Sequence, residues 1–90
     1  MHRSEAKVKA AIEACRPFLA EEEYLEISED NERHGEWGLA IEMLVDLLGE
    51  KEAKITEAQL KLIEDAFASM NLDPAGRTEY LRQFISSQPK

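Results

Sequence analysis

One run of the sequence predicts the architecture of the domain: His34-Gly35-Glu36-Trp37-Gly38-Leu39-Ala40-Ile41-Glu42-Met43-Leu44-Val45-Asp46-Leu47-Leu48. On a helical wheel its apolar residues leave one narrow polar stripe, which steps by three or four residues through Gly35, Gly38, Glu42, Asp46 and Gly49. A helix that is apolar on almost every other side needs the rest of a small domain packed around it. Two carboxylates at i and i+4 repel by about 0.2–0.5 kcal/mol, so we regard the stripe as a face for a partner outside the fold.

The pattern of the rest of the chain predicts further helices. Ninety residues suffice for one domain with one modest core, and no segment alternates with period two for long enough to be a strand. Thr56 and Gln59 form a capping box, Asn71 suits the left-handed position after a helix, and Gly49 is expected to end the central helix. We expect helices over roughly 4–15, 18–33, 35–49 and 56–70, and a last helix that begins at Asp73-Pro74 and buries Tyr80, Leu81, Phe84 and Ile85. The predicted fold is all-α: a single domain over residues 1–90, built as a small bundle of four to five short helices around a central apolar helix.

The acidic charge is concentrated in one segment. The chain carries a net charge of −8, and residues 21–36 hold eight acidic side chains against the single basic Arg33. Such a segment repels a phosphate backbone, which argues against direct nucleic-acid binding. It attracts and steers a basic protein. The simpler alternative is an acidic excess that only keeps the protein soluble.

The side chains that could do chemistry do not form a recognisable active site. Cys15 stands alone and falls on the apolar face of the first helix, so it is expected to be a buried thiol. His34 and Glu36 resemble the H-x-E pair of zinc deaminases, but those enzymes also need a P-C-x-x-C motif. We therefore expect no catalytic residues, no metal and no cofactor. Tyr24 and Trp37 are expected in the core, with an interface anchor as the alternative.

The same run resembles the pattern of MafI-type immunity proteins: His-Gly-Glu-aromatic-x-Leu-Ala-x-Glu-x-Leu-x-Asp-x-Leu, here His34 to Leu48. The spacing to Ile55-Thr56 and then to Met70-Asn71-Leu72 is also similar, so the resemblance covers about residues 25–72. It implies the cognate inhibitor of a toxin–antitoxin pair in interbacterial competition, including contact-dependent growth inhibition. For this group the toxin domain is often a ribonuclease of the EndoU type.

The resulting hypothesis is a cytoplasmic immunity protein that blocks the basic active-site surface of a toxin nuclease domain. It would work by occupying that surface and not by turnover, and it would be a monomer or a weak dimer when free, without contact to a membrane. The candidate partner-binding residues are Glu29, Asp30, Glu32, His34, Glu36, Glu42 and Asp46. One alternative is a helical adaptor or homodimerisation module without a toxin partner, and another is an enzyme that uses His34 and Glu36.

Overall fold

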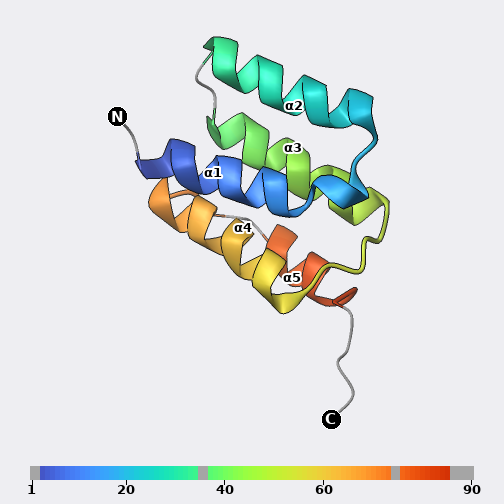
Figure 1. The fold of residues 1–90 in the computed structure, drawn as a ribbon. Coiled ribbons are helices and arrows are strands. Elements are labelled where there is room, and N and C mark those ends of the chain that lie inside the picture. The colour runs from blue at the N-terminus through green and yellow to red at the C-terminus, as the bar shows by residue number, and fades with distance from the viewer. Residues whose placement is uncertain (1–2, 35–36, 74–75, 86–90) are drawn as a thin grey trace.

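Helices make up all the regular structure in the residues that the structure describes (Figure 1). In chain order the elements are α1 (Arg3–Ala14), the 3₁₀ turn η1 (Arg16–Phe18), α2 (Glu21–His34), α3 (Trp37–Glu50), α4 (Glu57–Ser69) and α5 (Arg77–Arg82). The structure is a computed structural model and describes residues 3–34, 37–73 and 76–85, with side chains except at 3–4 and 30–34. No strand occurs within these ranges, so the predicted all-α class is confirmed.

The first two helices follow the prediction with one shift. Pro17 lies in η1, as expected for a residue that interrupts a helix, and α2 therefore begins at Glu21 instead of residue 18. The acidic end of α2 stays helical as far as His34. The predicted helix over 18–33 is thus correct in its last turn and too long at its start.

The end of the central helix α3 differs from the prediction. Gly49 stays inside the helix and is buried, and the left-handed residue is Glu52, with φ of 50°. The Ala53 N–H donates to the Leu48 carbonyl at 3.0 Å, and the Glu52 N–H donates to the Gly49 carbonyl at 3.1 Å. This pair of bonds is a Schellman motif, which satisfies the last carbonyls of α3 without glycine at the left-handed position.

Both predicted ends of α4 are confirmed. The Thr56 hydroxyl accepts from the Gln59 N–H at 3.1 Å, while the Gln59 side chain accepts from the Thr56 N–H at 2.8 Å. At the other end Asn71 is left-handed, with φ of 55°, and the Leu72 N–H donates to the Phe67 carbonyl at 3.0 Å. Local sequence alone therefore determines where α4 begins and ends.

The start of α5 was predicted wrongly. The helix begins at Arg77, after Gly76, and not at Asp73-Pro74. Gly76 has a φ of 81°, a left-handed conformation through which a right-handed helix cannot run. Leu81 is fully buried on the inner face, as expected, but Tyr80 is half exposed and Phe84 and Ile85 lie beyond the helix.

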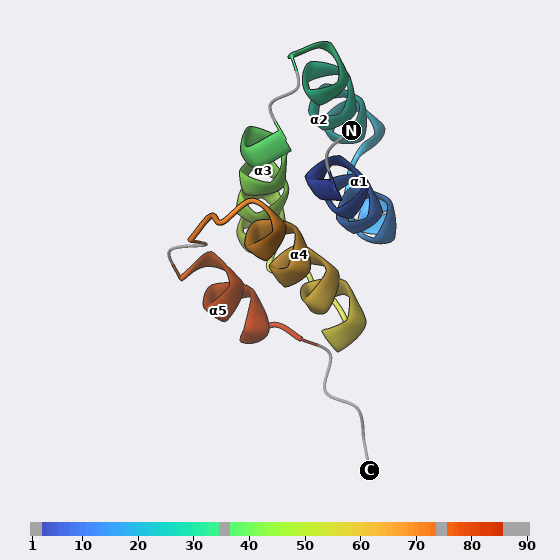
Figure 2. The ribbon, with the colours of Figure 1, turned by 90° about the vertical axis from the view of Figure 1, so that its left-hand side faces the viewer.

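The core lies where α1, α3 and α4 pack against one another, and α3 also contacts α2 and α5 (Figure 2). Figures 1 and 2 place α2 and α5 on opposite sides of α3. The predicted packing of the domain around the central helix is therefore confirmed. The largest fully buried side chains come from all five helices, from the residue after α1 and from the connection before α4: Val8, Cys15, Ile27, Ile41, Leu44, Leu48, Ile55, Leu60, Ile63, Phe67 and Leu81.

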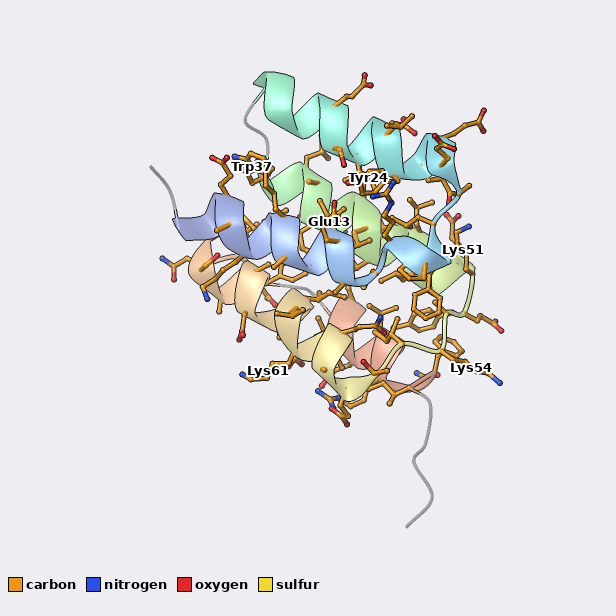
Figure 3. All side chains as sticks on the ribbon, in the orientation of Figure 1. Glu13, Tyr24, Trp37, Lys51, Lys54 and Lys61 are labelled. Atoms are coloured by element: carbon orange, nitrogen blue, oxygen red, sulfur yellow. The ribbon has the colours of Figure 1, made fainter. Side chains whose placement is uncertain are left out.

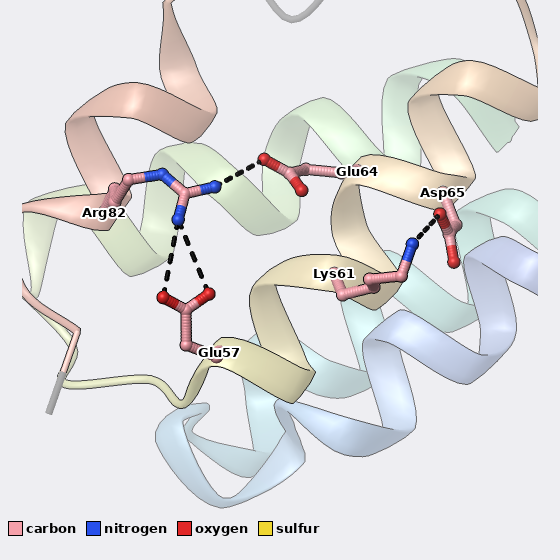
Figure 4. A network of polar contacts seen from close by, with 5 residues as sticks. All are labelled: Glu57, Lys61, Glu64, Asp65 and Arg82. Atoms are coloured by element: carbon pink, nitrogen blue, oxygen red, sulfur yellow. Dashed lines mark hydrogen bonds and ion pairs between the residues drawn. The ribbon is translucent and has the colours of Figure 1, made fainter. Parts of the chain in front are cut away.

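Short helix α5 is attached to α4 by an arginine as well as by Leu81 (Figure 4). Arg82 Nη2 lies 2.9 Å from Glu64 Oε2, and its Nη1 lies 3.4 Å from Glu57 Oε1. The guanidinium thus bridges two carboxylates about two helical turns apart on α4. Because all three side chains are well exposed, we assign this bridge a stabilisation of about 1 kcal/mol at most.

Candidate partner-binding surface

The first turn of α2 explains part of the acidic segment. The Glu23 carboxylate accepts the Ala20 N–H at 2.8 Å and lies 3.0 Å from Lys51 Nζ. These two contacts, the backbone bond first, hold the pKa of Glu23 below its ordinary value. Glu21 and Glu22 lie beside it, where the helix dipole favours negative charge. The carboxylates at this end of α2 therefore contribute to helix formation as well as to surface charge.

The outward face of α2 is acidic over its described length. Glu22, Glu26 and Glu29 are exposed and follow one another at spacings of four and three residues, so they share a face. Leu25 lies beside them and is 43% exposed. Ile27 points the other way and is completely buried. Negative charge is therefore directed away from the core, where a partner can reach it.

The structure places the sequence-predicted residues of this region as far as it describes them. Glu29 is on α2 and exposed. Asp30, Glu32 and His34 lie in the last turns of α2, but their side chains are outside the described residues. Glu36 lies outside the described residues altogether. The alternative of an enzyme that uses His34 and Glu36 therefore rests on side chains without a described geometry.

In the described residues the polar stripe of α3 lies against the C-terminal part of the chain at its glycines, while the Asp46 side chain stays 60% exposed, so binding of a partner by the stripe remains a prediction. Asp46 Oδ1 lies 3.2 Å from Arg77 Nε of α5. A Cβ at Gly38 would lie 3.1 Å from Leu72, and one at Gly49 would lie 3.2 Å from the Tyr80 ring. Gly38 and Gly49 are therefore sites of close packing by the C-terminal part of the chain.

Glu42 and Asp46 consequently do not join Glu29 on one surface. Asp46 is directed to the α5 side of α3, whereas α2 lies on the opposite side (Figure 2). Glu42 is half-buried on α3, one helical turn before Asp46. Arg77, which sequence reasoning did not single out, neutralises Asp46 from 31 residues away. No local pattern could have indicated that pair.

An open groove of about 450 Å³ runs between α3 and α5. Its polar side chains include the paired Asp46 and Arg77, so opposite charges already meet there. The groove is lined by Val45, Asp46, Gly49, Glu50, Gly76, Arg77 and Tyr80. Because its main charges satisfy each other, it offers less to a charged partner than the outward face of α2 does.

A second hollow, a cleft of about 290 Å³, lies between α1, α2 and the start of α3. Figure 3 shows Glu13, Tyr24 and Trp37 in this region. The Tyr24 hydroxyl donates to Glu13, and this bond is the main cause that raises the pKa of Tyr24. Both aromatic rings are only partly buried. They pack against the core, as predicted, and also line the cleft, while a role as interface anchor remains a prediction.

The described residues show no arrangement for catalysis by a thiol or for metal binding. Cys15 is completely buried, and burial raises the pKa of its thiol to about 11, so it stays protonated near neutral pH. Within residues 3–34, 37–73 and 76–85, no three His, Cys, Asp or Glu side chains come together as metal ligands would. None of the helices in these ranges is both long and apolar enough to span a membrane.

The chain was also compared with known proteins. No protein-family model, no curated protein and no solved structure matches it.

Proposed function

We propose that this protein is an immunity protein of the MafI type, which binds the nuclease domain of a toxin and blocks its basic active-site surface. The observation that carries the proposal is the outward acidic face of α2, formed by Glu22, Glu26 and Glu29. The resemblance of residues 34–48 to the MafI pattern supplies the class of partner. The toxin would be of the EndoU ribonuclease type.

Charge explains why such a partner is favoured over a nucleic acid. A nuclease that grips RNA presents lysine and arginine around its active site, because it must bind phosphates. The α2 face presents carboxylates that can bind the same lysine and arginine side chains and so compete with RNA. The net charge of −8 also steers a basic protein toward the molecule and speeds association at low salt.

We place the proposed contacts mainly on α2. Asp46 Oδ1 lies 3.2 Å from Arg77 Nε, so the charge of Asp46 is partly balanced within the fold. Glu29 keeps its proposed role, and Glu22 and Glu26 join it on the same face. A stable complex of this kind buries on the order of 800 Å² on each partner. That area reaches beyond the outward face of α2, so neighbouring surfaces of the bundle would take part.

The test is binding to the nuclease domain of the secreted effector encoded beside this protein's gene. The two proteins should co-purify, and the RNase activity of the domain should fall in proportion to the inhibitor added. The triple variant Glu22→Lys, Glu26→Lys, Glu29→Lys should lower the association rate constant at low salt by about 10-fold or more. Its effect should shrink as salt screens the charges.

A matched control separates position from net charge. The triple variant Glu50→Lys, Glu52→Lys, Glu79→Lys changes three exposed carboxylates that lie outside α2 and gives the same net charge, −2 instead of −8. It should retain most of the association rate. Equal losses in both triple variants would contradict a docking face on α2, and the absence of any complex with the nuclease domain would contradict the proposed function.

One observation favours the alternative of a homodimerisation module. Leu25 on α2 and Leu39 on α3 are 43% and 48% exposed, so each offers apolar surface to a second copy. Sedimentation equilibrium on the isolated protein distinguishes the two functions. A stable dimer that dissociates in Leu39→Glu would favour the alternative, while a monomer that binds the nuclease domain would favour the immunity function.

A further inference from the structure

The cleft between α1 and α2 combines aromatic walls with a carboxylate. Trp37 comes from the first turn of α3, Tyr24 from α2 and Glu13 from α1, and the buried Ile12 forms part of the lining. Ser28 adds a hydroxyl on the α2 side. Figure 3 shows Glu13, Tyr24 and Trp37 between the ribbons of α1 and α2. Aromatic faces beside a carboxylate are suited to hold a cation.

The fold already uses these rings to hold its own cations. The Lys9 ammonium lies 5.7 Å from the centre of the Trp37 ring, and the Arg16 guanidinium carbon lies 4.1 Å from the centre of the Tyr24 ring. Lys9 also lines the cleft, and its exposed ammonium lies 3.4 Å from Glu5 one turn earlier on α1. Because that contact is available outside the cleft, Lys9 can give way to another cation without losing every charged partner.

Glu13 keeps acceptor capacity for a second donor. Its Oε2 accepts the Tyr24 hydroxyl, while its Oε1 lies 3.8 Å from Arg16 Nη1, which is too far for a hydrogen bond. A carboxylate has about four acceptor positions. A donor that enters the cleft can therefore bond to Glu13 without displacing Tyr24.

We propose that this cleft binds an arginine side chain presented by a basic partner protein. Arginine fits better than lysine because its planar guanidinium stacks on aromatic rings and also donates to carboxylate and hydroxyl oxygens from one plane. Buried arginine in a pocket is a frequent anchor of protein interfaces. The identity of the partner rests on the proposed function, whereas the chemistry of the cleft is testable without it.

The test uses a small probe, N-acetyl-arginine-N-methylamide, and the fluorescence of Trp37, the one tryptophan of the chain. Titration should give a saturable change in emission, with amide shifts in NMR spectra at Glu13 and Ser28. The citrulline analogue has nearly the same shape without the charge and should bind at least about 3-fold more weakly. Two variants should change the affinity for the probe in opposite directions. Glu13→Gln keeps an acceptor for Tyr24 but should weaken binding about 3- to 10-fold, whereas Lys9→Gln removes the internal cation that lies over Trp37 and should strengthen binding.

Glu57→Gln serves as the control, because it removes an exposed carboxylate on α4 far along the chain from the cleft. It should leave probe binding unchanged. Equal binding of the arginine and citrulline probes, or no saturable signal, would overturn the proposal. If the nuclease domain binds wild type and Glu13→Gln equally well, the cleft is not its anchor although the immunity function stands. If the cleft binds the arginine probe but no complex with the nuclease domain forms, the arginine site stands and the immunity function does not.

Discussion

Replacing Ile27 with alanine tests how α2 is attached to the bundle. Among the α2 residues whose side chains the structure describes, Ile27 alone is completely buried. Truncating a buried isoleucine costs about 2–5 kcal/mol. We expect a loss near 3 kcal/mol, because α2 lies at the edge of the bundle and can settle partly into the space. A domain of this length unfolds with a free energy of about 5–13 kcal/mol, so the loss is a large fraction of the total.

The assay is urea denaturation followed by far-UV circular dichroism. With a slope of about 1–3 kcal/mol per molar urea, Ile27→Ala should lower the midpoint by about 1–3 M. Leu25→Ala is the matched control: it shortens an aliphatic side chain of the same helix that is 43% exposed, and should cost about 1 kcal/mol or less. Equal losses in the two variants, or a loss below about 1 kcal/mol for Ile27→Ala, would refute the described packing of α2 on α3.

Four further predictions follow from particular contacts. Thr56→Ala breaks the capping box of α4 and should lower the free energy of unfolding by about 1 kcal/mol, whereas Thr56→Ser should keep most of it. Gly49→Ala gains about 1 kcal/mol in helix propensity, but its added methyl group crowds the Tyr80 ring, so alone it should change stability little. In a Tyr80→Ala background the same substitution should stabilise the protein. Additive effects of the two substitutions would refute the contact. The lowered pKa of Glu23 stabilises the fold above the unfolded pKa of 4.5, and this stabilisation is lost as the pH falls through the folded pKa. Glu23→Ala should therefore destabilise the protein more at about pH 7 than at about pH 3. A loss of stability that does not depend on pH would contradict the ion pair. Cys15 should resist iodoacetamide in the native protein and react in urea above the midpoint, whereas native reactivity at the rate of a free thiol would contradict its burial.

The parts of the fold that depend on nearby residues could be predicted from the sequence. The capping box of Thr56 and the left-handed Asn71 act within a few residues of where they stand, so their chemistry is visible in the chain. The central role of α3 was predictable for a similar reason, because its apolar residues cover more of its circumference than one neighbour can bury. Helical periodicity likewise predicted the burial of Cys15.

The parts that depend on tertiary contacts could not be predicted in this way. Gly49 looked like a helix end because glycine is common there, but its small size serves the approach of Tyr80 from 31 residues later in the chain. The ion pair between Asp46 and Arg77 could not be predicted either, because the two residues are just as far apart along the chain. The cleft is missed for the same reason, since Glu13 and Tyr24 come from different helices. The acidic outward face of α2 was visible from charge alone, but its direction depended on knowing that Ile27 points inward.

The separation of the buried and exposed faces of α2 has a consequence for how the sequence of such a protein can vary. Ile27 faces the bundle, while Glu22, Glu26 and Glu29 are exposed on the outer surface of α2. The proposed recognition surface can therefore be changed at positions that contribute little to the folding free energy. A library randomised at the outer positions would be screened for new specificities on an unchanged scaffold, and variants that fail to fold would be rare in it.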